Sequence, residues 1–252
     1  MSRLDVPEGL RIVLASASPR RRELLSELLT PGSFAIRPVD LDERAFETFD
    51  PVESALSIAR AKAELAGESA APEGSCAAPP GPGSGIGSSQ GCTLGFVARP
   101  LQGQGREDKA SALPLVITAD TIVFRGGRQF GKPANPLEAV QMLGELSGRT
   151  HRVVTAYSVR FGDFMADRAV ITKVRFRRLS RAEIEEYVAT GESLDKAGGY
   201  AIQGGAAGFV LRVEGSLSNV IGLPLDELRA DLEQIFALIG SGSPEPGCHS
   251  QQ

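Results

Sequence analysis

The chain has 252 residues, 42% of them apolar, which is enough to form the core of one or two domains. Its 27 basic and 31 acidic side chains give a net charge of −4, without the basic excess typical of proteins that bind nucleic acids. Two His and three Cys exclude a zinc site and a disulfide scaffold, and they leave carboxylates, Lys, Arg and a hard metal ion for catalysis. Residues 1–11 lack the apolar stretch of a secretory signal, and no run approaches the roughly 18 apolar residues of a membrane span, so we expect a soluble, cytoplasmic protein.

The first predicted elements alternate between strand and helix. Residues 11–15 form a β-branched and apolar run that predicts a short buried strand. Ser18 is a typical N-cap and Pro19 a typical first residue of a helix, in which leucines then recur at helical spacing. Residues 34–39 predict a second strand, and residues 50–66 predict a helix that opens with a capping box.

Residues 68–112 differ in composition from the rest of the chain. They contain nine Gly, five Pro and six Ser, a composition that predicts a disordered insertion within a single domain of residues 1–240. The glycines do not form a nucleotide-binding motif. A disordered tail is expected at residues 241–252. The cysteines all fall in these two segments, at Cys76, Cys92 and Cys248.

After the insertion the alternation continues. Residues 115–124 predict a strand that is interrupted at residues 118–121, and Asn135 and Gly148 mark the start and the end of a helix. The remaining predicted elements are strands at 153–161 and 169–176, a helix from Ser180 to Gly191, short strands near 200–220 and a helix at 225–238. Alternating strands and helices are typical of an α/β fold.

The start of the first helix is a candidate anion site. Ser16 and Ser18 offer hydroxyl groups, Arg20 and Arg21 offer guanidinium groups, and the helix N-terminus offers free N–H groups. These features suit a phosphate. An ordinary capped helix with surface arginines is the alternative.

Three charged residues could serve catalysis. Asp120 is expected at the end of an apolar strand, where α/β proteins commonly bind ligands, and it could hold Mg²⁺ or act as a general base. A turn-forming Asp is the alternative. Lys62 and Lys132 could each meet a phosphate as a point charge, or could be solvated surface lysines.

Two further segments are rich in hydrogen-bonding groups. In residues 195–204, paired glycines allow close backbone approach, and Gln203 offers the donors and the acceptor that can recognise the edge of a base. Residues 215–225 offer neutral polar groups. Each segment could equally be a simple connection between elements. His151 is most simply a structural residue near the start of a strand.

Together these segments resemble the Maf family of nucleoside triphosphate pyrophosphatases. Seven stretches match the family's motifs in the family's order, over most of residues 11–240. They are LASASPRRRELL, ITADTIVF, GKP, AVQMLGELSGRTHRVVTA, TKVRF, DKAGGYAIQG and GSLSNVIGLPL.

The resemblance implies a fold like that of inosine triphosphatases, in which a mixed sheet with flanking helices forms two lobes around a cleft, and usually a homodimer. It implies hydrolysis of a nucleoside triphosphate to the monophosphate and pyrophosphate with a divalent metal cation, Mg²⁺ or Mn²⁺. The form of the DKAGGYAIQG stretch resembles that of the subgroup that acts on dTTP and UTP.

The resemblance also implies roles for individual residues. Asp120 matches the family's proton acceptor and Glu43 a functional acid, and both are candidate metal ligands. Lys62 and Lys132 match active-site lysines. The residues that match positions linked to substrate choice are Arg21, Thr121 and Gln203; the residues expected to meet the phosphates at the helix start are Ser16, Ser18, Arg20 and Arg21.

Two other functions stay open at this point. The same reaction could act on another modified or non-canonical nucleotide. Alternatively, the chain could be a nucleotide-binding regulator without turnover, a possibility that the long insertion ahead of the Asp120 strand leaves in place.

Overall fold

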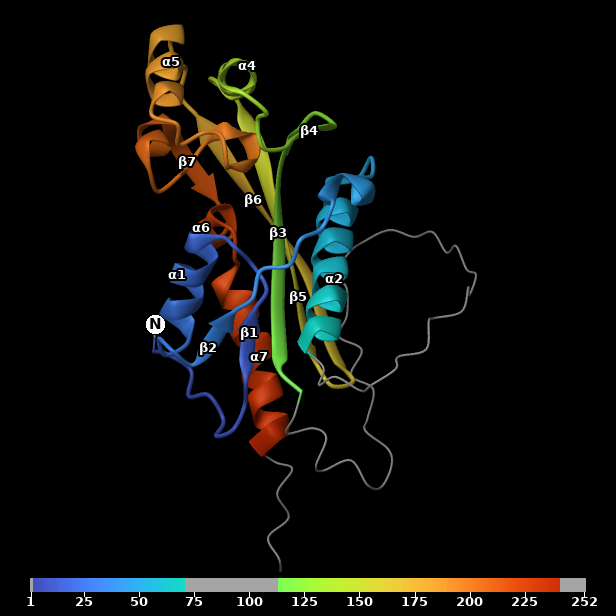
Figure 1. The fold of residues 1–252 in the computed structure, drawn as a ribbon. Coiled ribbons are helices and arrows are strands. Elements are labelled where there is room, and N and C mark those ends of the chain that lie inside the picture. Colours follow the sequence, from blue (N-terminus) through green and yellow to red (C-terminus); the bar gives the residue numbers. More distant parts are fainter. Residues whose placement is uncertain (1, 71–112, 241–252) are drawn as a thin grey trace, which may run out of the picture.

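The computed structural model describes residues 2–70 and 113–240 (Figure 1). The predicted insertion falls outside the described residues, except that its first three positions belong to a helix, Pro51–Ala70, that is longer than expected. The predicted tail and the three cysteines also lie outside them.

The described strands form one mixed sheet of seven strands, in the order β2-β1-β3-β5-β6-β7, with β4 paired to β3. Strands β1 and β2 and strands β1 and β3 are parallel, and the other pairs are antiparallel. The strand bounds are β1 Ile12–Leu14, β2 Phe34–Ile36, β3 Leu115–Arg125, β4 Arg128–Phe130, β5 Thr150–Phe161, β6 Phe164–Phe176 and β7 Val210–Glu214. A mixed sheet with flanking helices confirms the predicted α/β class.

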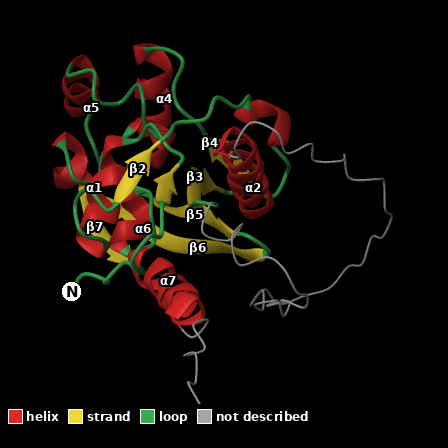
Figure 2. Ribbon diagram, turned by 60° about the horizontal axis from the view of Figure 1, so that its bottom comes forward, coloured by secondary structure: helices red, strands yellow, loops and turns green. Residues whose placement is uncertain are grey.

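Helices lie on both sides of the long strands (Figures 1 and 2). Helix α2 packs on one face through Ala55, Leu56 and Ala59, and α1 and α7 pack on the other. The helix bounds are α1 Pro19–Leu28, α2 Pro51–Ala70, α4 Pro136–Leu146, α5 Arg181–Ala189, α6 Leu217–Ile221 and α7 Leu225–Gly240, and the 3₁₀ helices are η1 Glu43–Phe46, η2 Ala197–Gly199 and η3 Gly205–Phe209. Among the described helices, none has the length and apolarity that crossing a bilayer requires.

The helix starts follow the predicted capping chemistry. Oγ of Ser18 accepts from the Arg21 amide and Oδ1 of Asn135 from the Glu138 amide. Ser180 and the Glu183 side chain form a complete capping box. Polar side chains thus satisfy N–H groups that a helix start leaves without partners.

Two separate hydrophobic clusters occupy the two ends of the long strands. Ile117 of β3 and Tyr157 of β5 belong to the cluster covered by α1 and α7. Val123 and Val153 of the same two strands belong to the cluster covered by α4 and α5. The clusters are the structural counterpart of the two lobes implied by the resemblance, and the polar middle of β3 lies between them.

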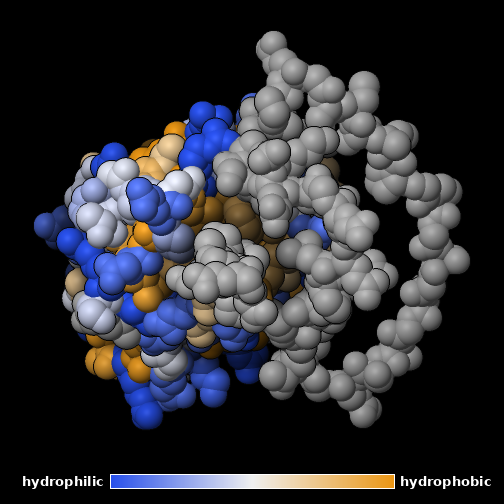
Figure 3. All heavy atoms as spheres, turned by 90° about the horizontal axis from the view of Figure 1, so that it is seen from below, coloured by the Kyte–Doolittle hydropathy of each residue, from blue (hydrophilic) through white to orange (hydrophobic). Residues whose placement is uncertain are grey.

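Hydrophilic and apolar residues are interspersed on the face seen from below, where that face is not drawn in grey (Figure 3).

One prediction about the strands is wrong, and another is confirmed only in part. Residues 118–121 do not interrupt β3, because they pair in continuous register with residues 155–158 of β5. Between residues 200 and 220, the only strand is β7, and the neighbouring residues form η2, η3 and α6. Gly198 and Gly199 both have φ of +71°, a left-handed backbone conformation that glycine readily adopts, and they form part of η2.

Candidate active site

The candidate site lies at the middle of β3, beyond the point where its neighbour β1 ends. Leu14, the last residue of β1, pairs with Ile117, so Asp120 and Thr121 extend past the carboxyl end of β1. The prediction that Asp120 ends its own strand is therefore wrong, because it is the parallel neighbour that ends. Successive residues of a strand point to opposite faces, so Asp120 faces α2 and Thr121 faces α1.

On the α2 side, one ammonium group joins two carboxylates. Nζ of Lys62 lies 2.7 Å from Oε1 of Glu43 and 3.0 Å from Oδ1 of Asp120. The side chains of Lys62 and Asp120 are 10% and 9% exposed, whereas that of Glu43 is 39% exposed. We call these three residues the carboxylate cluster. Lys62 is therefore not the solvated surface lysine that the sequence alone allows.

Glu43 reaches the cluster from η1. Asp42 caps this short helix by accepting from the Arg44 amide, which fixes the backbone at Glu43. Partial burial acts to raise the pKa of Glu43, but the hydrogen bond and charge of Lys62 outweigh it, so the net pKa lies below its ordinary value. Glu43 is therefore a carboxylate at neutral pH.

Lys132 borders the same cluster from a more open position. Its ammonium lies 3.9 Å from Oε2 of Glu43, and 62% of its side chain is exposed. The preceding Gly131 carbonyl accepts from the Gly198 amide at 3.0 Å, which joins the GKP turn to the glycine pair at 198–199. The structure thus places both predicted lysines beside Glu43.

On the α1 side, the guanidinium of Arg21 makes hydrogen bonds to three different segments. Nη2 donates to Oγ1 of Thr121 at 3.0 Å, Nη1 to Oγ of Ser16 at 3.3 Å and Nε to the Gly222 carbonyl at 2.9 Å. Burial lowers the pKa of Arg21, opposed by the charges of Asp120 and Glu43. The Arg21 contacts and the carboxylate cluster therefore lie within electrostatic reach of each other.

A hydrogen-bond chain behind Thr121 was not predicted. The hydroxyl groups of Thr121 and Thr155 lie 3.0 Å apart, and Thr155 donates to the Asn219 carbonyl at 2.7 Å. The fully buried Asn219 side chain bonds the Val153 carbonyl and Thr172. The neutral polar groups of residues 215–225 were the available signal, and they hold the site from behind.

The helix start at α1 is only partly as expected. Oγ of Ser16 accepts from the Ser18 amide at 3.2 Å, and Ser16 is 7% exposed. Arg20 forms an ion pair with Glu192, Nη2 to Oε1 at 3.5 Å. Gln203 lies exposed between η2 and η3, and its neighbours at 204–205 also contact Glu192. Glu192 was not among the site residues predicted from the sequence.

His151 occupies the second hydrophobic cluster, away from these groups. Its Nε2 lies 2.8 Å from the Tyr200 hydroxyl, and its ring packs edge-on against Phe176. Burial, together with the charge of Arg125, lowers the pKa of His151 from 6.5 to about 4. The imidazole is therefore neutral at pH 7, in agreement with the structural interpretation.

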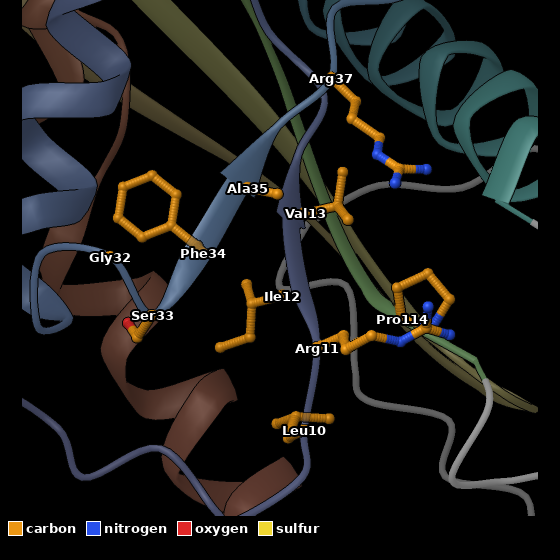
Figure 4. A pocket seen from close by; sticks show the side chains of 10 residues that line it. All are labelled: Leu10, Arg11, Ile12, Val13, Gly32, Ser33, Phe34, Ala35, Arg37 and Pro114. Carbon is orange, nitrogen blue, oxygen red and sulfur yellow. The ribbon is translucent and has the colours of Figure 1, made fainter.

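A cavity of about 290 Å³ lies along β1 and β2 and is lined by Ile12, Phe34 and Pro114 among others (Figure 4). These residues stand at or just before the amino ends of their strands. None of the predicted site residues lines it. The cavity is therefore separate from the candidate site, which lies beyond the carboxyl end of β1.

Comparison with known proteins finds matches over most of the chain. A family model described as Maf-like protein matches residues 11–235. A dTTP/UTP pyrophosphatase of Geobacter sulfurreducens is 40% identical over 230 residues, covering 90% of this chain and 98% of the relative. Proteins of the same name from Anaeromyxobacter dehalogenans and Pyrococcus furiosus are 41% and 38% identical, over 89% and 90% of this chain and 93% and 99% of their own.

Proposed function

This chain belongs to the Maf family, and we propose that it hydrolyses dTTP and UTP to the nucleoside monophosphate and pyrophosphate. The observation that supports this most strongly is the carboxylate cluster, in which Lys62 contacts both Glu43 and Asp120 beside the Arg21–Thr121 pair. Hydrolysis of a triphosphate requires a carboxylate that can accept a proton from water and cations that stabilise charge on the phosphates, and this cluster supplies both kinds of group.

In this proposal Asp120 is the proton acceptor. It accepts a proton from water as the water oxygen forms a bond to the α-phosphorus, and the bond from that phosphorus to the bridging oxygen breaks. The bridging oxygen leaves with pyrophosphate. Lys62 donates a hydrogen bond to Oδ1 of Asp120 at 3.0 Å, which holds the carboxylate in position.

Cations around the site would stabilise the charge on the phosphates. Lys62, Lys132 and Arg20 are the candidates, and the Ser16 and Ser18 hydroxyls stand at the start of α1. Groups that are already oriented cost little reorganisation when charge develops on the leaving pyrophosphate.

A divalent cation fits the donor set. Among the described residues no group of three or more His, Cys, Asp and Glu forms a metal cage, but Glu43 and Asp120 both point at the same ammonium group. Mg²⁺ typically uses one or two carboxylates and completes its shell with waters and substrate phosphates. We propose that Glu43 and Asp120 hold Mg²⁺ or Mn²⁺, which would neutralise part of the triphosphate charge.

Arg21, Thr121 and Gln203 are the proposed selectivity residues. Arg21 is held by its hydrogen bonds to Ser16 and to the Gly222 carbonyl, and it donates a third to Thr121 in the middle of β3. Gln203 is exposed, so its side-chain amide is accessible to a base. By the same resemblance we propose a cytoplasmic homodimer, which sedimentation would test, and the net charge of −4 favours a small nucleotide over a nucleic acid.

A pyrophosphate-release screen across canonical and modified triphosphates tests the function. We expect release from dTTP and UTP with Mg²⁺, and loss of at least about 10²–10³ in kcat for Asp120→Asn. Release of orthophosphate alone would overturn the pyrophosphatase assignment. Faster pyrophosphate release from a triphosphate with a modified base would change the proposed substrate but not the proposed reaction. A dTTP-induced rise in Tm without pyrophosphate release at any metal concentration would favour the regulator.

A further inference from the structure

The loop that carries Gln203 is held at both ends by side chains of α5 and of the connection that follows it. On one side of Gln203, the Ala201 amide donates to Oη of Tyr187 at 3.0 Å. On the other side, the Gly205 amide donates to Oε2 of Glu192 at 2.9 Å. We call residues 201–205 the glutamine loop. Its backbone is thus fixed two residues before and two residues after the exposed Gln203.

Glu192 also sits directly on the backbone of the glutamine loop. A Cβ atom added to Gly204 would lie 1.8 Å from Oε1 of Glu192, far inside van der Waals contact. Gly204 is therefore needed for the approach of the carboxylate, at a φ of −109° that other residues could adopt. A side chain at position 204 would have to displace the carboxylate of Glu192 from this place on the loop.

The same carboxylate extends the connection to α1. Its Oε1 lies 3.5 Å from Nη2 of Arg20, and the two side chains are 29% and 20% exposed. Burial raises the pKa of Tyr187, and the charge of Glu192 acts in the same direction. Glu192 therefore joins the glutamine loop to the residue next to Arg21.

We propose that Glu192 is a positioning residue that sets nucleotide selectivity by holding Gln203 in place relative to the start of α1. This inference rests on the proposed function, because it takes Gln203 as a group that contacts the base. A loop that is already ordered loses less conformational entropy when nucleotide binds, so its contacts yield more affinity. Glu192 contacts neither Asp120 nor Lys62, so its removal leaves the proposed proton acceptor and its lysine in place. Its ion-pair partner Arg20 is retained in every Glu192 variant.

A double-mutant cycle tests this inference. We compare wild type, Glu192→Ala, Gln203→Ala and the double variant, measuring kcat and KM with dTTP, UTP and, as a purine probe, dGTP. Glu192→Ala should raise KM for dTTP about tenfold, leave kcat within about twofold and narrow the preference for dTTP over dGTP. In the Gln203→Ala background, Glu192→Ala should not narrow the preference for dTTP over dGTP any further. Both substitutions remove the same proposed contact between Gln203 and the base.

Controls separate positioning from a general loss of structure. Glu186→Ala removes an exposed glutamate of α5 and should leave both kinetic constants unchanged. Glu192→Gln retains one oxygen for the Gly205 amide and should shift KM in the same direction by less; it replaces Glu192→Ala in the cycle if the alanine variant does not fold. An unchanged KM and preference in the folded variant, or full additivity with Gln203→Ala, would overturn the proposal.

Calorimetry with dTTP and dGTP distinguishes this failure from failure of the proposed function. A wild-type protein that releases no pyrophosphate contradicts the function. If the Glu192 variant nevertheless binds dTTP more weakly than wild type does, and with a smaller preference over dGTP, the positioning role stands. Equal binding of dTTP and dGTP by the wild type and the variant would contradict the positioning role.

Discussion

Nζ of Lys62 lies 3.0 Å from Oδ1 of Asp120, and both side chains are almost wholly removed from solvent. The contact joins the middle of α2 to the middle of β3, and it places the second carboxylate, Glu43, on the same ammonium group. One lysine therefore both compensates the buried charge of Asp120 and fixes the direction in which its carboxylate points.

Removing that lysine should destabilise the fold as well as the chemistry. Lys62→Met leaves Asp120 as an unpaired buried charge, and we expect a loss of about 3–5 kcal/mol in the free energy of unfolding. Asp120→Asn added to Lys62→Met should recover most of this loss, because the charge is then gone. Urea denaturation of the four proteins measures both. A double variant no more stable than Lys62→Met would contradict the pairing.

Arg21 should not be replaceable by another cation. Arg21→Lys can retain at most part of the fork that bonds Ser16, Thr121 and the Gly222 carbonyl. We expect KM for dTTP and UTP to rise about tenfold or more while the fold remains intact. Arg22→Lys, at the exposed neighbouring position, is the matched control and should behave as wild type. Equal kinetic constants for the two variants would refute the importance of the fork.

The buried imidazole of His151 should make stability depend on pH. Its pKa falls from 6.5 in the unfolded chain to about 4 in the fold, so the unfolded state binds the additional proton between these values. Its contribution is complete above pH 6.5 and is lost, by about 3 kcal/mol in total, as the pH falls towards 4. Other carboxylates also titrate there, so the comparison is with His151→Phe. The variant's unfolding free energy should fall less between pH 7 and pH 4.5, and parallel profiles would contradict this assignment.

A second buried carboxylate holds α7 to the sheet. Asp231 is fully buried and accepts from the Tyr157 hydroxyl at 2.6 Å and from the guanidinium of Arg168. Asp231→Ala should cost on the order of 3 kcal/mol of stability, since it leaves both donors without this acceptor. Glu233→Ala on the exposed side of the same helix should cost under about 0.5 kcal/mol. Thermal unfolding that shows similar losses for both would contradict the role of Asp231.

Local chemistry made much of the fold predictable. Ser18, Asn135 and Ser180 are polar residues ahead of apolar helices, and each caps the predicted helix. The interruption at residues 118–121 was predicted wrongly because polar residues such as Thr118, Asp120 and Thr121 are also typical of turns. Their backbone is held in β3 by pairing with β5, a partner more than thirty residues away, which no local pattern reveals.

For the candidate site too, local sequence predicts some residues, and others become evident only from the fold. Clustered serines and arginines, an isolated Asp and two lysines indicated where chemistry could lie, and the resemblance added Glu43. Glu192 could not be found this way, because it lies in an ordinary helix-to-loop connection. Glu192 packs on the backbone of Gly204, where an added Cβ would lie only 1.8 Å from its Oε1, and it pairs with Arg20. Both contacts join segments that only folding brings together.

The position of the water oxygen in the products tests the central claim most directly. Hydrolysis of dTTP in H₂¹⁸O, followed by mass analysis of both products, shows which phosphorus the water attacks. The proposed mechanism, with Asp120 as the acceptor at the α-phosphorus, predicts one ¹⁸O atom in dTMP and none in pyrophosphate. Label in pyrophosphate, or release of labelled orthophosphate, would contradict it.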